Sequence, residues 1–412
     1  MVCRLPASSF GSEHSLNLSE KILSLFSPML QNRLLALRRD LHQHPELSFQ
    51  EKRTSAKLYE ELESLQPAQL ARVAETGIIA CIRGRNPHAP VVAIRGDIDA
   101  LPIQEETGLP WASVHAGVMH ACGHDVHAAW AIGAAHLLKE NPAVGDVLIV
   151  LQPAEEIGQG AQALLQSGVL EDVRAIFGAH VDRRFAVGEI VAEAGPLAAS
   201  ADTFSIELIG NGAHGARPHE SSDPVVGAGA LIGALQTIVS RRLNPAHAGV
   251  VSIGSVHAGT ASNIIPERAQ LTGTLRATRP EVRRLLQTEM QTISEAVACA
   301  YGLQAVTNIE AGTPPLVNLE APVRWAQQAV RNILSEKALV PLGFLNLAGE
   351  DFAFYLEKMA GCFLRIGARE PGGEATPAHA PRFYPAEESI FIGAAVLAGT
   401  ARVASAALSH ET

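Results

Sequence analysis

A strand, helix and strand in the first half of the chain most limit the folds that it can adopt. Residues 91–94 and 147–151 are continuous runs of aliphatic residues, which indicate strands buried on both faces. Between them, residues 128–139 are apolar and rich in alanine, a composition that favours a helix packed on a sheet. A helical crossover joins parallel strands. The sequence therefore predicts an α/β layer around a buried sheet.

A different pattern begins near residue 199. Residues 203–210 alternate with period two, which indicates an antiparallel strand with one solvated face. The segments that follow predict a helix, two strands and a helix, at residues 224–242, 250–257, 269–277 and 280–300. This β-α-β-β-α series is typical of a small, ferredoxin-like α+β domain.

The length of 412 residues exceeds one ordinary compact core and favours two domains. We expect a larger, mixed-sheet α/β domain formed by residues 29–198 and 313–412. The smaller α+β domain, residues 199–312, is inserted into it. Residues 1–28 are expected to form an N-terminal tail.

Charge and cysteine usage exclude several classes of protein. The formal net charge is −10 and no cluster of Lys and Arg is visible, so a nucleic-acid partner is not expected. The five cysteines are odd in number and scattered, which argues against a disulfide framework and for a reducing compartment. Every apolar stretch of about 18 residues has polar interruptions, so no membrane span is expected. We therefore expect a cytoplasmic protein.

Residues 120–127, His-Ala-Cys-Gly-His-Asp-Val-His, concentrate metal-binding chemistry. Cys122 and His124 flank a glycine in a sharp turn before the helix, so both side chains can point at one place. Sulfur and imidazole together suit a divalent transition metal. An isolated cysteine is more often a buried structural residue, but the surrounding cluster favours a ligand here. His120 and His127 are expected to orient ligands or to pack.

Further candidates follow other strands. Glu155 and Glu156 come directly after the buried run 147–151, which disfavours the alternative of a solvated acidic turn. One carboxylate can bind metal while its neighbour takes a proton from the attacking water. His180 ends a short strand, and His379 lies in the run Thr-Pro-Ala-His-Ala-Pro. Together these residues reach the roughly six ligand contacts that a site for two divalent ions needs.

Two aspartates after the first buried run are candidates for orienting the ligating imidazoles. Asp99 is the better candidate. Asp97 is alternatively only a carboxylate at a strand end.

These motifs resemble those of the dinuclear aminoacylase and carboxypeptidase metallohydrolases. The resemblance is closest to the amidohydrolase branch, which contains indole-3-acetyl-amino-acid hydrolases, hippurate hydrolases and N-acetyldiaminopimelate deacetylases. It extends over nearly the whole chain from about residue 29. The matching motifs are residues 38–47, 95–102, 120–127, 152–156, 213–219, 259–266 and 349–352.

The resemblance implies two divalent metal ions per subunit, bridged by a cysteine, and a general base. The implied ligands are Cys122, His124, Glu156, His180 and His379. Glu155 is implied as the general base. Asp97 falls where other branches place a ligand histidine, and the pattern implies that His124 substitutes for it. Manganese or zinc is the first expectation, with cobalt and nickel next, since sulfur, imidazole and carboxylate together suit all four metals.

The inserted domain resembles the family's lid and dimerisation domain, which implies a homodimer. His214 resembles a histidine that reaches the neighbouring subunit's site and steadies the carbonyl oxygen. Asn263 and Arg276 resemble contacts to the substrate carboxylate, a group that fits an arginine fork. An arginine on a strand is alternatively a solvated residue.

Three departures from the family pattern concern specificity. Ala179 replaces the usual leucine, residues 182–185 are Asp-Arg-Arg-Phe, and the last motif contains His-Ala-Pro instead of the commoner His-Ser-Pro or His-Thr-Pro. None of them removes an implied ligand. They therefore bear on the substrate.

The sequence thus predicts a cytoplasmic, metal-dependent amidohydrolase that cleaves an N-acyl-amino acid or a related small amide. The alternative is a dipeptidase or carboxypeptidase, which would use the same metal and general base with a different substrate pocket. A non-catalytic homologue that binds a small molecule would keep the fold without turnover. A structural zinc protein is disfavoured, because it predicts a closed tetrahedral site without an adjacent free glutamate.

Overall fold

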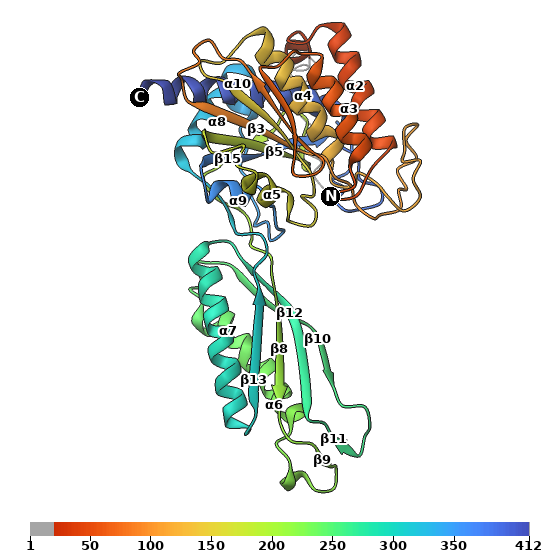
Figure 1. Ribbon diagram of the computed structural model, residues 1–412, viewed down its shortest axis with the longest axis vertical. Helices are drawn as coiled ribbons and strands as arrows, with labels where there is room; N and C mark the ends of the chain where they lie inside the picture. The colour runs from red at the N-terminus through yellow and green to blue at the C-terminus, as the bar shows by residue number, and fades with distance from the viewer. Residues whose placement is uncertain (1–19, 412) are drawn as a thin grey trace, which may run out of the picture. The chain divides into compact units, whose positions relative to one another are not determined.

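The computed structural model describes residues 20–411, which form two compact units (Figure 1). Unit 1 comprises the described residues up to 194, residues 318–343 and those from 355 onward, and unit 2 comprises residues 195–317 and 344–354. The sequence had placed the boundaries between 198 and 199 and between 312 and 313. Most of the expected N-terminal tail, residues 1–19, lies outside the described residues. Ile22 and Phe26 are buried in the core of unit 1.

Unit 1 is built on a seven-stranded mixed sheet with the order β1-β2-β4-β3-β5-β15-β6. The strands are β1 (Gln69–Val73), β2 (Gly77–Ile82), β3 (Val91–Asp97), β4 (Val147–Gln152), β5 (Val173–Ala186), β6 (Ile190–Val191) and β15 (Ala360–Arg369). β3 pairs in parallel with both β4 and β5, and β5 pairs in parallel with β15. The outer strands β1, β2 and β6 pair antiparallel with their neighbours. The predicted parallel strands with a helical crossover are confirmed.

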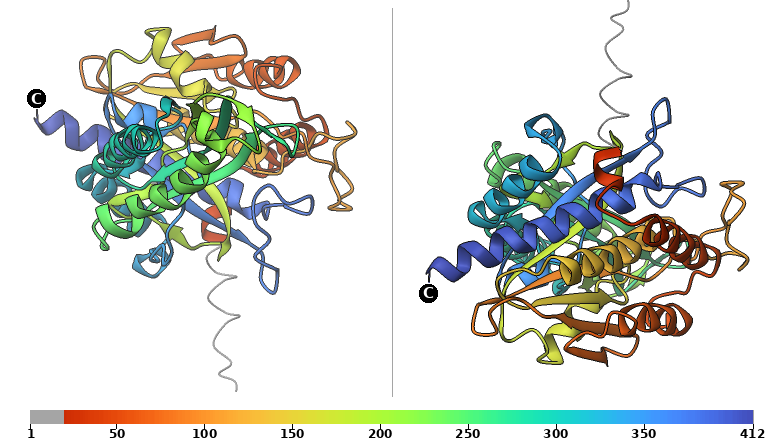
Figure 2. Two further views of the ribbon diagram at one scale, coloured as in Figure 1. Left: turned by 90° about the horizontal axis from the view of Figure 1, so that it is seen from below. Right: turned by 90° about the horizontal axis from the view of Figure 1, so that it is seen from above.

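Helices cover this sheet. They are α2 (Pro28–Gln43), α3 (Lys52–Glu63), α4 (His124–Glu140), α5 (Gly160–Gln166), α8 (Glu320–Ile333), the 3-10 turn η3 (Glu336–Ala338) and α10 (Glu388–Glu411). The short helix α9 (Ala353–Leu356) spans the residue at which the two units divide. α10 lies along α4 on one face of the sheet (Figure 2). α4 is buried along almost its whole length, as its alanine-rich sequence predicts.

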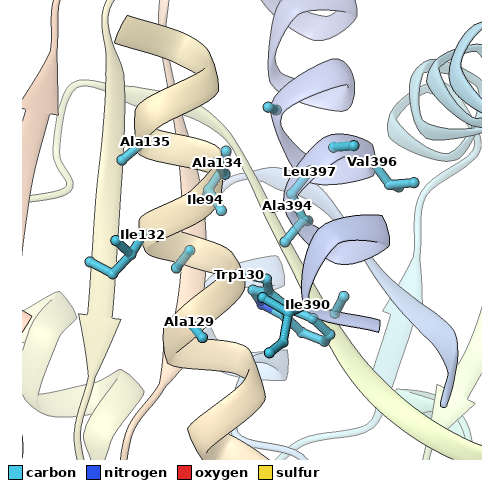
Figure 3. Packing of buried hydrophobic residues seen from close by; sticks show 14 of the residues in the cluster. Ile94, Ala129, Trp130, Ile132, Ala134, Ala135, Ile390, Ala394, Val396 and Leu397 are labelled. Atoms are coloured by element: carbon cyan, nitrogen blue, oxygen red, sulfur yellow. The ribbon is translucent and has the colours of Figure 1, made fainter. Parts of the chain in front are cut away.

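The contact between α4 and α10 depends on small residues. Trp130 of α4 is fully buried beside Ile390 and Ala394 of α10 (Figure 3). A Cβ atom at Gly393 would lie only 2.2 Å from the Trp130 ring, so a glycine is needed for this approach. The core therefore selects residue size as well as hydrophobicity.

Unit 2 has a four-stranded antiparallel sheet with the order β10-β12-β8-β13, packed on two helices (Figure 1). The elements are β8 (Asp202–Ile209), α6 (Pro224–Thr237), β10 (Gly249–Ala258), β12 (Arg268–Ala277), α7 (Pro280–Ala300) and β13 (Gln304–Glu310). This is the predicted ferredoxin-like order with one more strand. β13 has no fully buried residue, so it lacks the apolar run by which a strand is recognised.

Short elements complete unit 2 and its connections to unit 1. They are β7 (Gly195–Ala198), β9 (Ala213–His214), η1 (Pro218–Glu220), η2 (Ile238–Arg242), β11 (Ile264–Ile265) and β14 (Leu316–Asn318). β7 pairs with β14, and β9 pairs with β11. The predicted fold class, a mixed-sheet α/β domain with an inserted α+β domain, is confirmed.

Two helices of the described residues are long and apolar enough to cross a membrane by length and composition alone. In the helix Glu388–His410, 78% of the most apolar window is buried, which is the pattern of a core helix. In Pro224–Arg242 only 33% of the window is buried. Its exposed apolar residues are Val225, Val226 and Val239.

His136 on α4 makes unit 1 sensitive to acid. Burial, with a smaller contribution from Arg33, lowers the pKa of this imidazole from 6.5 to about 4. Between those values the unfolded chain binds more protons than the folded chain, so the free energy of unfolding falls as the pH falls. We expect His136→Gln to flatten this part of the profile, measured by denaturant unfolding from pH 4 to 8. An unchanged slope would contradict a neutral, half-buried His136.

Candidate metal centre

The site residues predicted from the sequence of unit 1 gather where its parallel strands end. β3 ends at Asp97, Glu155 follows β4, and His180 lies in β5 just beyond its pairing with β3. Cys122 precedes α4, and His379 lies in the loop between β15 and α10. Loops at the carboxyl edge of an open α/β sheet are where such folds bind ligands.

Gly123 allows Cys122 and His124 to approach β5. It is the N-cap of α4 and has a φ of +90°, a conformation that L-residues with a side chain seldom adopt. A Cβ atom here would also lie 2.4 Å from a methyl group of Val181. Any other residue would therefore push the cysteine and the histidine away from the strand.

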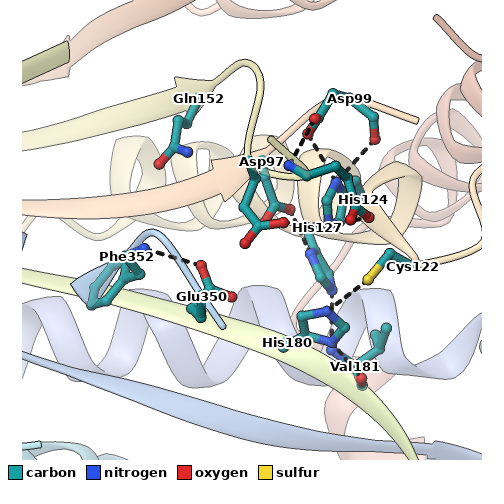
Figure 4. A network of polar contacts seen from close by, with 12 residues as sticks. Asp97, Asp99, Cys122, His124, His127, Gln152, His180, Val181, Glu350 and Phe352 are labelled. Carbon is teal, nitrogen blue, oxygen red and sulfur yellow. Dashed lines mark hydrogen bonds and ion pairs between the residues drawn. The ribbon is translucent and has the colours of Figure 1, made fainter. Parts of the chain in front are cut away.

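The donor atoms lie close together and are largely buried. Cys122 Sγ is 3.2 Å from His180 Nε2, and the two side chains point at each other (Figure 4). The carboxylate of Glu156 lies 3.8 Å from His124 Nε2 and 3.4 Å from His379 Nε2. Three overlapping groups therefore have their donor atoms within reach of one ion: Cys122, His124 and His180; Cys122, Glu156 and His379; and His124, Glu155 and Glu156.

These residues fit divalent cations. His124 Nε2 and Glu156 Oε1 are buried and have no hydrogen-bond partner among the described residues, an expensive arrangement unless a ligand completes it. Burial, reinforced by the charge of Glu156, raises the pKa of the Cys122 thiol well above its usual value. Burial also raises the pKa of Glu156 to about 7. A bound cation reverses both shifts, because it stabilises thiolate and carboxylate.

Asp99 holds two of these residues in place. His124 Nδ1 donates to the backbone oxygen of Asp99 at 2.9 Å and lies 3.1 Å from its carboxylate, which leaves Nε2 for a metal. The other carboxylate oxygen accepts from the backbone N–H of Glu156 at 3.0 Å and from the hydroxyl of Ser48 at 2.7 Å. No local pattern in the sequence points to Ser48.

His127 is occupied by protein partners. Its Nδ1 donates to Asp97 at 2.6 Å, and its Nε2 accepts from the backbone N–H of Val181 at 3.0 Å. Arg95 also binds Asp97. Although Asp97, His124 and His127 could surround an ion, these hydrogen bonds use both ring nitrogens of His127. It therefore connects β3 to the part of β5 that carries the ligand candidate His180.

Glu155 is held by a backbone turn. The preceding Ala154 has a φ of +52°, which is strained for alanine. The buried carboxylate of Glu51 accepts from the Ala154 N–H at 3.0 Å and from the Thr76 hydroxyl at 2.6 Å. Burial raises the pKa of Glu51. Glu51 was not predicted, because a lone glutamate before a helix carries no signal for this contact.

The start of α4 is fixed by a buried ion pair. Arg38 of α2 donates to Asp125 at 2.7 Å, and His42 of the same helix lies 2.9 Å from the same oxygen. Burial opposes ionisation of Asp125, but the positive charge of Arg38 holds its pKa far below the usual value. This pair accounts for part of the motif at residues 38–47 and orients the neighbouring His124.

His120 is fully buried, and neither of its ring nitrogens has a hydrogen-bond partner in the part of the chain that the structure describes. Burial lowers the pKa of its imidazole to about 4. It stays neutral in the packed interior.

The remaining predicted residues belong to unit 2. His214 of β9 pairs with Ile264 of β11, and Asn263 accepts a 2.8 Å hydrogen bond from the backbone beside His214. Arg276 lies near the other end of β12, opposite Val250. The intervening strand is about 26 Å long at its usual rise per residue. One chain therefore brings His214 and Asn263 together but keeps Arg276 apart from both.

The chain was compared with known proteins. Residues 93–403 match the peptidase family M20/M25/M40. N-acetyl-L-cysteine deacetylase of Bacillus subtilis is 41% identical over 82% of this chain and 81% of its own length. N-acetyldiaminopimelate deacetylase of Listeria monocytogenes is 36% identical over 87% of this chain and 96% of its own length.

Solved structures agree. The Bacillus subtilis YXEP protein, described as a dinuclear metal-binding peptidase of the M20 family, superimposes with a TM-score of 0.82 at 39% identity. The match covers 92% of this chain and 99% of that protein. The present chain belongs to the peptidase family M20/M25/M40. The predicted resemblance is confirmed, and with it the class of enzyme, a metal-dependent amidohydrolase.

Asp99→Asn should weaken metal binding about 10- to 100-fold, the usual effect of losing a partner that orients a ligand. The amide cannot accept from both Ser48 and Glu156 while it also holds His124. The dissociation constant of Zn²⁺ would be measured by competition with a chelator. Asp172→Asn, at an exposed aspartate, is the matched control. Equal affinities of the two variants would rule out this role for Asp99.

Proposed function

We propose that this protein removes the acyl group from an N-acyl-amino acid or a closely related small amide. The observation that carries the proposal is the buried group of Cys122, His124 and His180, with the carboxylates of Glu155 and Glu156 at 3.9 and 3.8 Å from His124 Nε2. Such a set combines ligands with a further carboxylate that can act as a base, as a metal hydrolase requires. The names of the relatives, which include two deacetylases of N-acetylated amino acids, support the substrate class.

In this proposal five residues of the subunit would hold two divalent ions. The ligands are Cys122, His124, Glu156, His180 and His379. His180 is suited to this role because its Nδ1 donates to the Val181 carbonyl at 2.6 Å, which directs Nε2 at the site. Manganese or zinc is the expected metal, and cobalt or nickel also suits these donors. The four cysteines of the described residues are free, which supports a cytoplasmic enzyme.

The reaction would divide between the residues as follows. When bound, the ions polarise the scissile carbonyl and make the attacking water more acidic. Glu155 takes the proton of that water and passes it to the leaving nitrogen. His214 of a second subunit steadies the carbonyl oxygen as negative charge develops there. Asn263 and Arg276 bind the substrate carboxylate. Because the two residues lie far apart in one chain, we infer that the two contacts come from different subunits.

Glu155→Gln should lower kcat at least about 100-fold, because the amide cannot accept the proton. Its content of bound metal should stay at the wild-type level, since the proposed ligands are intact. Turnover and metal content would be measured on protein stripped of metal and reloaded with manganese, zinc or cobalt. Glu140→Gln, at an exposed residue at the end of α4, is the control. Near-normal turnover of Glu155→Gln would exclude it as the base.

The substrates in this experiment separate the alternatives. The panel consists of N-acetyl, N-benzoyl and indole-acyl amino acids together with simple dipeptides. Metal-dependent cleavage of the acyl-amino acids supports the proposal and identifies the preferred acyl group. Cleavage of dipeptides alone indicates a peptidase. Two bound ions without turnover of any compound indicate a binding protein.

An exposed apolar surface on unit 2 supports a homodimer formed through the inserted domain. Val225 and Val226 of α6 are 46% and 53% exposed, and Ile264 of β11 is 58% exposed. Val225 and Ile264 line a hollow of about 360 Å³ together with Pro266 and residues 258–262. Apolar side chains gathered in this way indicate a protein contact. The same surface accounts for the low burial of the apolar helix Pro224–Arg242 without a membrane.

A trans role for His214 can be tested by mixing two inactive variants. His214→Asn and Glu155→Gln would be co-expressed with different tags. If His214 acts on the neighbouring subunit, each heterodimer contains one complete site, and the mixture should recover about a quarter of wild-type activity. If His214 acts within its own chain, the mixture should stay as inactive as either variant. Two differently tagged copies of Glu155→Gln provide the background.

A further inference from the structure

The guanidinium of Arg183 is buried where the sequence departs from the family pattern. Arg183 lies on β5, three residues after His180, and is 2% exposed. Its terminal nitrogens donate to the two carboxylate oxygens of Glu370 at 2.6 and 3.1 Å. The hydroxyl of Tyr384 donates to the same carboxylate at 2.7 Å, and the guanidinium lies 4.5 Å from the centre of the tyrosine ring. This two-oxygen contact is available to arginine and not to lysine.

The other partners of Arg183 lie in the loop that carries His379. We call residues 370–384 the His379 loop. Arg183 donates to the backbone carbonyl of Glu374 at 2.8 Å and to that of Tyr384 at 2.6 Å. Together with its ion pair to Glu370, these bonds connect the Arg183 side chain to residues 370, 374 and 384 of the His379 loop.

His379 needs such support because its own side chain is poorly packed. The side chain is 54% exposed, and its backbone φ of +66° is one that L-residues seldom adopt. Near His379 the loop is held by backbone hydrogen bonds. The His379 N–H donates to the carbonyl of Ala121, and the N–H of Glu106 donates to the carbonyl of Pro381, each at 2.8 Å. Arg183 supplies the contacts at the two ends of the loop.

We propose that Arg183 is a positioning residue that fixes the His379 loop and thereby sets the affinity for the ion that His379 binds. The inference rests on the proposed function, in which His379 and Glu156 are ligands. Burial opposes ionisation of Glu370, but its hydrogen bonds from Arg183 and Tyr384 lower its pKa to about 2. The ion pair that anchors the loop is therefore present at neutral and mildly acidic pH.

The test compares Arg183→Met with Arg184→Met, which removes the neighbouring arginine. Arg184 is the matched control because it is 47% exposed and its carboxylate partner is Asp182, at 2.7 Å. Metal-free protein is titrated with Zn²⁺ alone against a chromophoric chelator, which yields a dissociation constant for each of the two ions. The unfolding midpoint of the metal-free protein is measured in parallel. His379→Ala identifies the constant that belongs to its ion.

For Arg183→Met we expect one ion, the one affected by His379→Ala, to bind about 10- to 100-fold more weakly. The other constant and the unfolding midpoint should stay close to wild type, and Arg184→Met should match wild type throughout. If Arg183→Met bound both ions with wild-type dissociation constants, the positioning role would be overturned. An equal loss at both ions together with a lower midpoint would also overturn it, since that is the result of general destabilisation.

The outcome for His379→Ala separates this inference from the proposed function. If His379→Ala loses one ion and Arg183→Met does not, only the role of Arg183 is wrong. If His379→Ala keeps both ions with wild-type affinity, the ligand assignment fails and the inference fails with it. If Arg183→Met cannot be obtained folded, Arg183→Lys and Glu370→Gln replace it. Each keeps part of the contacts and should shift the same constant by a smaller factor.

Discussion

The parallel pairing of β3 with β4 and β5 is the constraint on which the candidate site depends. Parallel strands share the edge at which they end, so the residues that follow them are brought together from distant parts of the chain. Asp97, Glu155 and His180 meet for this reason. The crossover between β3 and β4 adds Cys122 at the start of α4. A sheet with antiparallel central strands would place these side chains at opposite edges.

Burial then decides which atoms remain for metal. Buried polar atoms need partners, and the Nδ1 atoms of His124 and His180 both donate to backbone carbonyls. Their Nε2 atoms therefore face the centre. His127, by contrast, uses both nitrogens to connect β3 with β5. Three histidines that lie close together in space thus have different hydrogen-bond partners, and these partners distinguish the two ligand candidates from His127.

The two strained backbone positions of the site have supports far away in the sequence. Ala154, which precedes the proposed base, is held by Glu51, and the loop of His379 is held by Arg183. Positive φ values in residues other than glycine persist only where surrounding contacts enforce them. The proposed base and one proposed ligand therefore depend on buried charged side chains that touch no substrate. Arg183 belongs to a segment whose departure from the family pattern suggested a change of substrate, but its side chain makes its hydrogen bonds with the His379 loop.

Local patterns in the sequence determined the fold class, the central strands, the long helices and the candidate ligands. Aliphatic runs and helical periodicity report the burial of the segment that contains them, so they can be read without knowledge of the rest of the chain. The exposed strand β13 has no such signal and was missed. Only the tertiary structure decided that Ser48, Glu51 and Arg183 support the site, and that most of the length of β12 separates Asn263 from Arg276. Contacts of this kind join residues far apart in sequence, and their geometry exists only once the sheet and its loops have packed.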